Sequence, residues 1–182
     1  MDIRGVHHLA MRCNDAKQPV EWYRSHLKMD YLMAMVEELV PTSGQPTSYM
    51  HIYLDAGVAG HLTFFELPDE PPKGRDPNTP DWVQHVSFRL GSVAELEAEK
   101  SRLESEGVAV RGLIDHVLFQ SIYVTDPNGH KLVFSADTAD ENSLEKLANV
   151  KEQVLAEWDR TKRPPHHARW VHEHLFAGDG GD

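Results

Sequence analysis

Two seven-residue segments of this chain are near copies of each other. Positions 6–12 read VHHLAMR and positions 83–89 read VQHVSFR. When Leu and Val, Ala and Ser, and Met and Phe count as equivalent, the segments differ only at their second position. Both are short and rich in apolar residues, as half-buried strands are. A duplicated strand predicts two similar modules, and each module opens with a strand that carries one histidine on its more polar face, His8 or His85.

The stretches that follow each copy have the same order in both halves. Pro19 suits the first turn of a helix after the first copy, and Ser92 with Glu95 forms a capping box after the second. Strand-like stretches then follow at 30–36, 47–54 and 61–67 in the first half, and at 108–114, 118–125 and 130–136 in the second. The order βαβββ, repeated once, predicts an α+β fold.

The segments between and after the modules set the predicted boundaries. We expect a first module over 1–67, a proline-rich linker over 68–80, a second module over 81–137, and a C-terminal helix and tail over 138–182. Asn142 with Glu145 forms another capping box at the start of that helix. Its apolar stripe predicts docking on a sheet or pairing with a second chain, and we expect a homodimer; the stripe is Leu144, Leu147, Val150, Val154 and Trp158.

Composition excludes several classes of partner. The 29 acidic residues outnumber the 18 basic ones, and a net charge of −11 disfavours nucleic acid and anionic membrane surfaces. No apolar run approaches the length of a membrane span, and the N-terminus lacks the apolar core of a signal peptide. A single cysteine, Cys13, excludes a disulfide framework and a multi-cysteine zinc site. We therefore expect a cytoplasmic protein.

The duplicated histidine strand, the paired βαβββ order and the turn Asp126-Pro127-Asn128-Gly129 together resemble the vicinal oxygen chelate superfamily. That superfamily includes glyoxalase I, bleomycin-resistance proteins, epimerases and extradiol dioxygenases. The resemblance covers about residues 4–136. It implies that the sheets of the two modules form a curved, partly closed barrel around a divalent metal ion.

The resemblance also implies a set of metal ligands. It assigns His8 from the first strand, His85 from the fifth and Glu66 from the fourth, whereas the last ligand position holds Val133, which cannot bind a metal. Two imidazoles and one carboxylate suit Fe(II), with Mn(II), Zn(II) or Ni(II) as alternatives. Glyoxalase-type sites use four protein ligands, so the loss of one disfavours glyoxalase chemistry. Glu66 could instead be a solvated strand end.

Two further residues resemble the proton-handling groups of extradiol dioxygenases. Tyr123 precedes Val133 by the spacing that those enzymes show, and His116 lies upstream in a slightly shortened segment. A tyrosine hydroxyl can donate to a developing oxyanion, and a histidine can carry a proton near neutral pH. The alternative is that Tyr123 is an ordinary strand aromatic. We expect His7 to face away from His8, and the histidine-rich tail to be a solvated arm; its histidines are His166, His167, His172 and His174.

These observations favour a metal-dependent enzyme that resembles single-domain extradiol dioxygenases. Its substrates would be dioxygen and a small catechol-like molecule with two adjacent oxygens. Two alternatives stay open: a lyase or isomerase of the glyoxalase kind, and a protein of the bleomycin-resistance kind that binds small molecules without chemistry. The valine at position 133 favours the binding protein, and the spacing of Tyr123 favours the oxygenase.

Overall fold

The computed structural model describes residues 2–166 and 169–170. Its secondary structure confirms the βαβββ order of both halves. The strands and helices of the first half are β1 (His8–Cys13), α1 (Lys17–Leu27), β2 (Tyr31–Leu39), β3 (Pro46–Asp55), a 3-10 turn (Gly57–Ala59) and β4 (His61–Glu66). Those of the second half are β5 (His85–Arg89), α2 (Val93–Ser105), β6 (Arg111–Asp115), β7 (Phe119–Thr125) and β8 (Lys131–Asp137), followed by α3 (Glu141–Thr161).

The strands form two separate four-stranded sheets. The first has the order β1-β4-β3-β2 and the second the order β5-β8-β7-β6. In the first sheet β1 runs parallel to β4, while β3 is antiparallel to both β4 and β2. This arrangement confirms the predicted α+β fold with a C-terminal helix, and the strands are not joined into one closed barrel.

The residues cluster into two compact units, each of which is described by itself. The first unit contains the chain up to Val86 together with Glu106–Ala109 and Val124–Leu132. The second contains Ser87–Ser105, Val110–Tyr123 and the chain from Val133 onward. Because this grouping cuts across β7 and β8, it does not test the module boundaries, which stay a prediction from the sequence.

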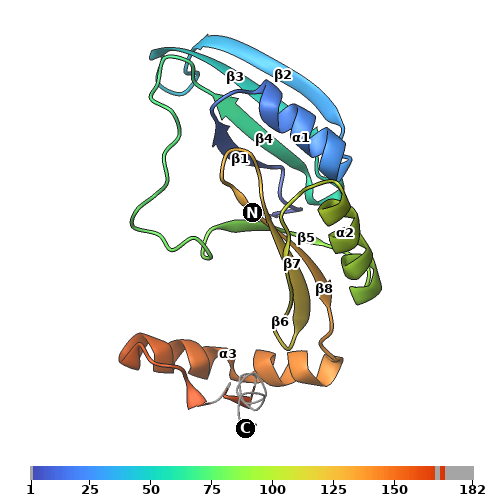
Figure 1. Cartoon of the computed structure of the whole chain (residues 1–182). Coiled ribbons are helices and arrows are strands. Elements are labelled where there is room, and N and C mark those ends of the chain that lie inside the picture. The colour runs from blue at the N-terminus through green and yellow to red at the C-terminus, as the bar shows by residue number, and fades with distance from the viewer. Residues whose placement is uncertain (1, 167–168, 171–182) are drawn as a thin grey trace. The chain divides into compact units, whose positions relative to one another are not determined.

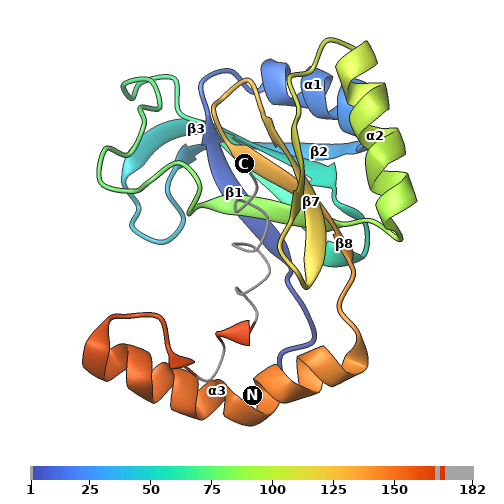
Figure 2. The same ribbon diagram turned by 60° about the horizontal axis from the view of Figure 1, so that its bottom comes forward.

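The core of the first unit lies between α1 and one face of the first sheet, as both Figure 1 and Figure 2 show. Tyr23 of α1 is fully buried, and its ring lies 5.3 Å from the ring of Phe64 in β4. The Tyr23 hydroxyl donates to a carboxylate oxygen of Asp126 at 3.1 Å. The other oxygen of Asp126 accepts from the backbone N–H groups of Asn128 and His130. These hydrogen bonds hold the turn that follows β7 against α1.

The opposite face of the first sheet carries imidazoles. His8 in β1 pairs with His61 in β4, and Phe65 in β4 pairs with His51 in β3. Alternate residues of a strand point to opposite faces, so these side chains lie away from Phe64 and α1. We call this surface, which bears His8, His51 and His61, the histidine face.

The second helix begins as the sequence predicts. The backbone N–H of Glu95 donates to the hydroxyl of Ser92 at 3.2 Å. The Glu95 carboxylate accepts from the backbone N–H of Gly91 at 2.9 Å, one residue earlier than in the usual capping box. Leu96 and Leu103 of α2 are fully buried. The capping residues therefore start this helix, and its apolar side holds it in the core.

The third helix departs from the prediction at its first turn. Its N-cap is Asp140 rather than Asn142, and the Asp140 carboxylate accepts from the backbone N–H of Ser143 at 2.6 Å. No residue of α3 is buried, and Leu144 and Trp158 of the apolar stripe are about half exposed. The homodimer that would cover this stripe stays a prediction. Among the described residues no helix is long and apolar enough to cross a membrane.

Candidate functional site

The histidine face brings together aromatic and imidazole rings from three strands. The ring centroids of His8 and His51 lie 6.1 Å apart. His51 stacks on Phe65, with centroids 3.7 Å apart and planes inclined by 16°. Tyr53 lies next to both histidines, 4.4 Å from His51 and 6.2 Å from His8. The strand pairing therefore surrounds the predicted ligand His8 with groups that can contact a small ring compound.

His51 is a functional candidate that the sequence analysis missed. The residue is only 5% exposed, and its Nε2 atom is buried without a hydrogen-bond partner. Burial lowers the pKa of the imidazole, and the nearby His8 lowers it further. The ring is thus neutral at neutral pH and keeps an unused ring nitrogen. The signal in the sequence was alternation, since His51 and Tyr53 share one face of a predicted strand.

His7 lies against His8 instead of facing away from it. The Nδ1 atoms of the two rings are 2.7 Å apart, so one ring donates a hydrogen bond and the other accepts it. Strand alternation does not separate the two side chains because β1 begins only at His8. This contact occupies Nδ1 of His8 and leaves its Nε2 as the nitrogen for a ligand.

Glu66 is not brought together with His8. It pairs with Cys13 in β1 and Met50 in β3, which places it on the same face as Phe64 and opposite the histidine face. The Glu66 carboxylate accepts a hydrogen bond from the backbone N–H of Ala16 at 2.6 Å, just before α1. Glu66 therefore holds the start of α1. Burial and the Glu66 charge raise the pKa of the Cys13 thiol to about 12, so this cysteine is a poor nucleophile.

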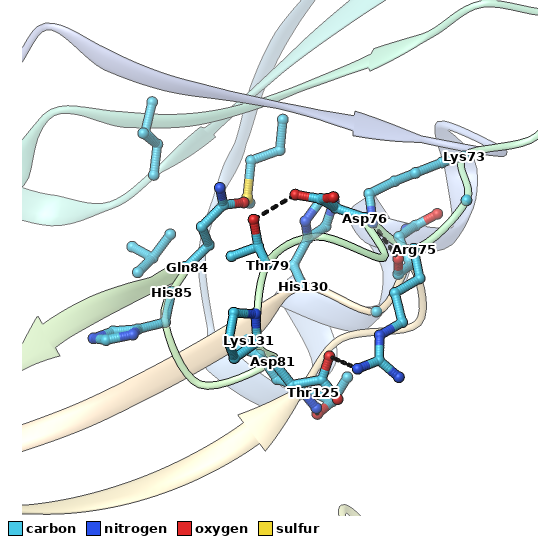
Figure 3. A pocket seen from close by; sticks show the side chains of 17 residues that line it. Lys73, Arg75, Asp76, Thr79, Asp81, Gln84, His85, Thr125, His130 and Lys131 are labelled. Atoms are coloured by element: carbon cyan, nitrogen blue, oxygen red, sulfur yellow. Dashed lines mark hydrogen bonds and ion pairs between the residues drawn. The ribbon is translucent and has the colours of Figure 1, made fainter.

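His85 lies at the edge of a pocket of about 600 Å³ in the first unit. Its ring is exposed, and Nδ1 lies 3.3 Å from the backbone oxygen of Trp82. Figure 3 shows the ring directed away from Thr79 and Asp76 on the linker side of the pocket. His8 does not line this pocket. The pocket and the histidine face are therefore different surfaces of the first unit.

His116 and Tyr123 form a hydrogen-bonded pair in the second unit. The Nε2 atom of His116 lies 2.7 Å from the hydroxyl of Tyr123, and both side chains are partly buried. The imidazole also stacks on Phe119, with centroids 4.7 Å apart. Val117 in the turn between β6 and β7 has a φ of 72°, a costly conformation for a β-branched residue. The strained turn thus presents His116 to the tyrosine that follows in β7.

Comparison with known proteins identifies the family. The model of the Glyoxalase/Bleomycin resistance protein/Dioxygenase superfamily matches residues 5–134. The chain belongs to this superfamily. A curated relative is the "Putative ring-cleaving dioxygenase MhqA" of Bacillus subtilis (strain 168), 28% identical over 139 residues, or 75% of this chain. The chain spans 42% of the length of that relative.

Solved structures of other proteins share the fold. A lactoylglutathione lyase from Agrobacterium tumefaciens has a TM-score of 0.53 at 17% identity, with 75% of this chain and 96% of that chain covered. TnmS3, an antibiotic binding protein from Streptomyces sp. CB03234, has a TM-score of 0.53 at 18% identity. The match covers 76% of this chain and 99% of TnmS3. At these identities the likeness shows the fold alone.

Members of the superfamily typically bind divalent metals, so the described residues can be tested as a ligand set. Of the three imidazoles on the histidine face, those of His8 and His51 have centroids 6.1 Å apart, and the carboxylate of Glu66 lies on the other face. Nowhere in 2–166 or 169–170 do three or more His, Cys, Asp or Glu side chains converge on a point that could hold a metal ion. The described residues therefore do not form the three-ligand centre that the resemblance implies.

Val133 marks a second departure from a four-ligand site. It lies in β8 and is almost fully buried. Ser135, two residues on and hence on the same face, exchanges hydrogen bonds with the hydroxyls of Ser87 at 3.0 Å and Ser121 at 2.8 Å. This face of the second sheet presents a valine and a row of hydroxyl groups where the superfamily's last carboxylate is expected.

Proposed function

We propose that the protein is an enzyme of the ring-cleaving dioxygenase type. Its substrates would be dioxygen and a catechol-like compound with two adjacent oxygens. The observation that supports this most is the 2.7 Å contact between His116 and Tyr123, because ring cleavage needs a group that handles the proton of a phenolic hydroxyl. The name of the Bacillus subtilis relative supports the same reaction class.

The pair can move a proton in two linked steps. The Tyr123 hydroxyl donates its proton to Nε2 of a neutral His116, and its oxygen can then accept the proton of a substrate hydroxyl. Phe119, stacked on the imidazole, covers one side of the ring. The two residues would thereby deprotonate the diol without leaving a free charge on the tyrosine oxygen.

The metal in this proposal is Fe(II), with Mn(II), Zn(II) or Ni(II) as alternatives, and His8 and His85 are its proposed ligands. The third ligand is not assigned, since Glu66 lies on the other face of the first sheet. We expect His8→Ala and His85→Ala each to lower the metal content of the purified protein by about tenfold or more. Elemental analysis measures this, with His26→Ala on α1 as the matched control. Equal metal content in all four proteins would contradict the assignment.

Oxygen consumption tests the reaction itself. Protein reconstituted with Fe(II) under anaerobic conditions should take up oxygen when catechols are added, and a coloured ring-opened product should accumulate. An oxygen electrode and absorbance spectra measure both. If no oxygen is consumed across a panel of catechols, the enzyme proposal fails.

A second candidate is a binding protein without chemistry. The described residues bring no three metal ligands together, and Val133 replaces the last expected ligand. Under this proposal the ring-lined histidine face would hold an aromatic compound through Phe65, Tyr53 and the unused nitrogen of His51. Tight binding of aromatic compounds by metal-free protein, with no oxygen uptake, would support it over the enzyme.

A further inference from the structure

We propose that the pocket of the first unit is a binding site for a small organic anion, an apolar body that carries one acidic group. The pocket measures about 600 Å³, within the range of small-molecule sites. The linker that follows β4 forms one side, and the turn between β7 and β8 together with residues of β1 and of the segment 84–86 forms the rest. Figure 3 shows the basic side chains Lys73, Arg75 and Lys131 around it.

Two of these positive charges are not compensated. Lys73 and Lys131 are both only partly exposed. The Lys73 ammonium donates to the backbone oxygen of Asn128 at 3.0 Å, and the Lys131 ammonium donates to the hydroxyl of Thr125 at 2.9 Å. Both acceptors are neutral, and neither lysine has a carboxylate within ion-pair distance among the described residues. Partly desolvated ammonium groups with neutral acceptors favour an incoming anion.

The carboxylates of the pocket are already engaged. Asp81 pairs with Arg75 at 2.9 Å. Asp76 accepts from the hydroxyl of Thr79 and from the backbone N–H of Asn78, and these bonds lower its pKa. Asp76 keeps its charge, but the three basic side chains that line the pocket outnumber its two carboxylates. On a chain of net charge −11, this is a local site of positive charge.

The rest of the pocket indicates an organic rather than an inorganic anion. Leu9 and Met11 of β1 and Val86 of β5 contribute apolar lining beside the basic groups. Burial of an apolar body against these side chains adds to the attraction of the charge. The pocket volume also exceeds what a bare phosphate or acetate ion would fill.

The proposal does not depend on the oxygenase activity. His8, His51, His116 and Tyr123 do not line the pocket, and His85 at its edge turns its ring away. Binding can therefore be measured on metal-free protein, so a failure of the oxygen-uptake experiment leaves this result unaffected.

The test compares two probes of the same shape. Isothermal titration of the full chain at low salt with 1-naphthoate should give saturable binding, and the neutral 1-naphthamide should bind about tenfold more weakly or worse. Raising the salt concentration should weaken naphthoate and leave naphthamide unchanged. Equal binding of the two probes, or no binding of naphthoate at millimolar concentration, would overturn the proposal.

Matched lysine variants locate the site. Lys73→Met and Lys131→Met should each weaken naphthoate binding by about tenfold, while Lys151→Met on the exposed part of α3 should not change it. Lys131→Arg keeps the charge and should retain binding within a few-fold, which separates loss of charge from loss of fold. Thermal melts confirm that each variant is folded. If Lys73→Met does not fold, the comparison of Lys131→Met with Lys131→Arg is enough to test whether the lysine charge binds the anion. Unchanged binding in Lys131→Met would place the anion elsewhere and contradict the assignment.

Discussion

A Tyr123→Phe protein loaded with Fe(II) is expected to consume oxygen with catechols about a hundredfold more slowly than the unaltered protein. The substitution removes only the hydroxyl that lies 2.7 Å from Nε2 of His116, and one positioned proton-transfer group contributes about 10²-fold or more. The metal content should not change, because Tyr123 is not a proposed ligand. Oxygen-electrode rates and elemental analysis on the same samples measure both quantities.

The matched variants show whether the two residues act as a unit. His116→Asn should slow turnover by a similar factor, and the double variant should be little slower than either single one. Tyr31→Phe on the exposed strand β2 is the control for removal of a tyrosine hydroxyl. Additive losses in the double variant, or a Tyr123→Phe rate equal to that of the control, would show that the pair does not relay a proton.

The second large effect concerns stability. Asp126→Ala is expected to lower the free energy of unfolding by about 3 kcal/mol or more. Its buried carboxylate accepts from the Tyr23 hydroxyl and from two backbone N–H groups, and hydrogen bonds to a charged group contribute about 1.5–3 kcal/mol each. Tyr23→Phe removes only one of these bonds and should lower the free energy of unfolding by about 1.5 kcal/mol or more. Urea unfolding followed by circular dichroism measures both.

Two controls distinguish this network from general effects of substitution. Asp69→Ala removes an exposed carboxylate in the linker and should change the free energy of unfolding by less than about 0.5 kcal/mol. Above pH 10 the unaltered protein should lose stability, because burial and the Asp126 charge raise the pKa of Tyr23 well above that of an unfolded tyrosine. Tyr23→Phe should lessen that loss. An Asp126→Ala protein as stable as Asp69→Ala would mean that the turn is held by other contacts.

The order of strands and helices was predictable because the chain repeats its own pattern. The repeated segment located β1 and β5, and strand-like apolar stretches located the other six strands. Asp140 was missed as a cap because Asn142 and Glu145 satisfy the capping-box pattern, whereas Asp140 is followed three residues later by Ser143.

The site was less predictable. Alternation along a strand shows which residues share a face of the sheet, but it does not show whether that face is covered by a helix or bears the site. Phe64 and Glu66 do share a face, but the contact of Phe64 with Tyr23 makes that the helix-covered one. His51 has no counterpart in the repeated segment, so the repeat did not point to it, and alternation placed it only on the same strand face as Tyr53. His116 and Tyr123 meet despite the shortened segment, because Val117 adopts a left-handed conformation that no propensity favours.

Strand β2 has a consequence for how the protein behaves in concentrated solution. It is an edge of the first sheet, and every residue from Tyr31 to Leu39 is exposed. An edge strand with apolar side chains and unpaired backbone groups is a template for strand addition from another molecule. The negative charges of Glu37 and Glu38 in this strand oppose the addition of a second such strand. High salt screens the charges of these side chains and so weakens the repulsion that keeps such edges apart.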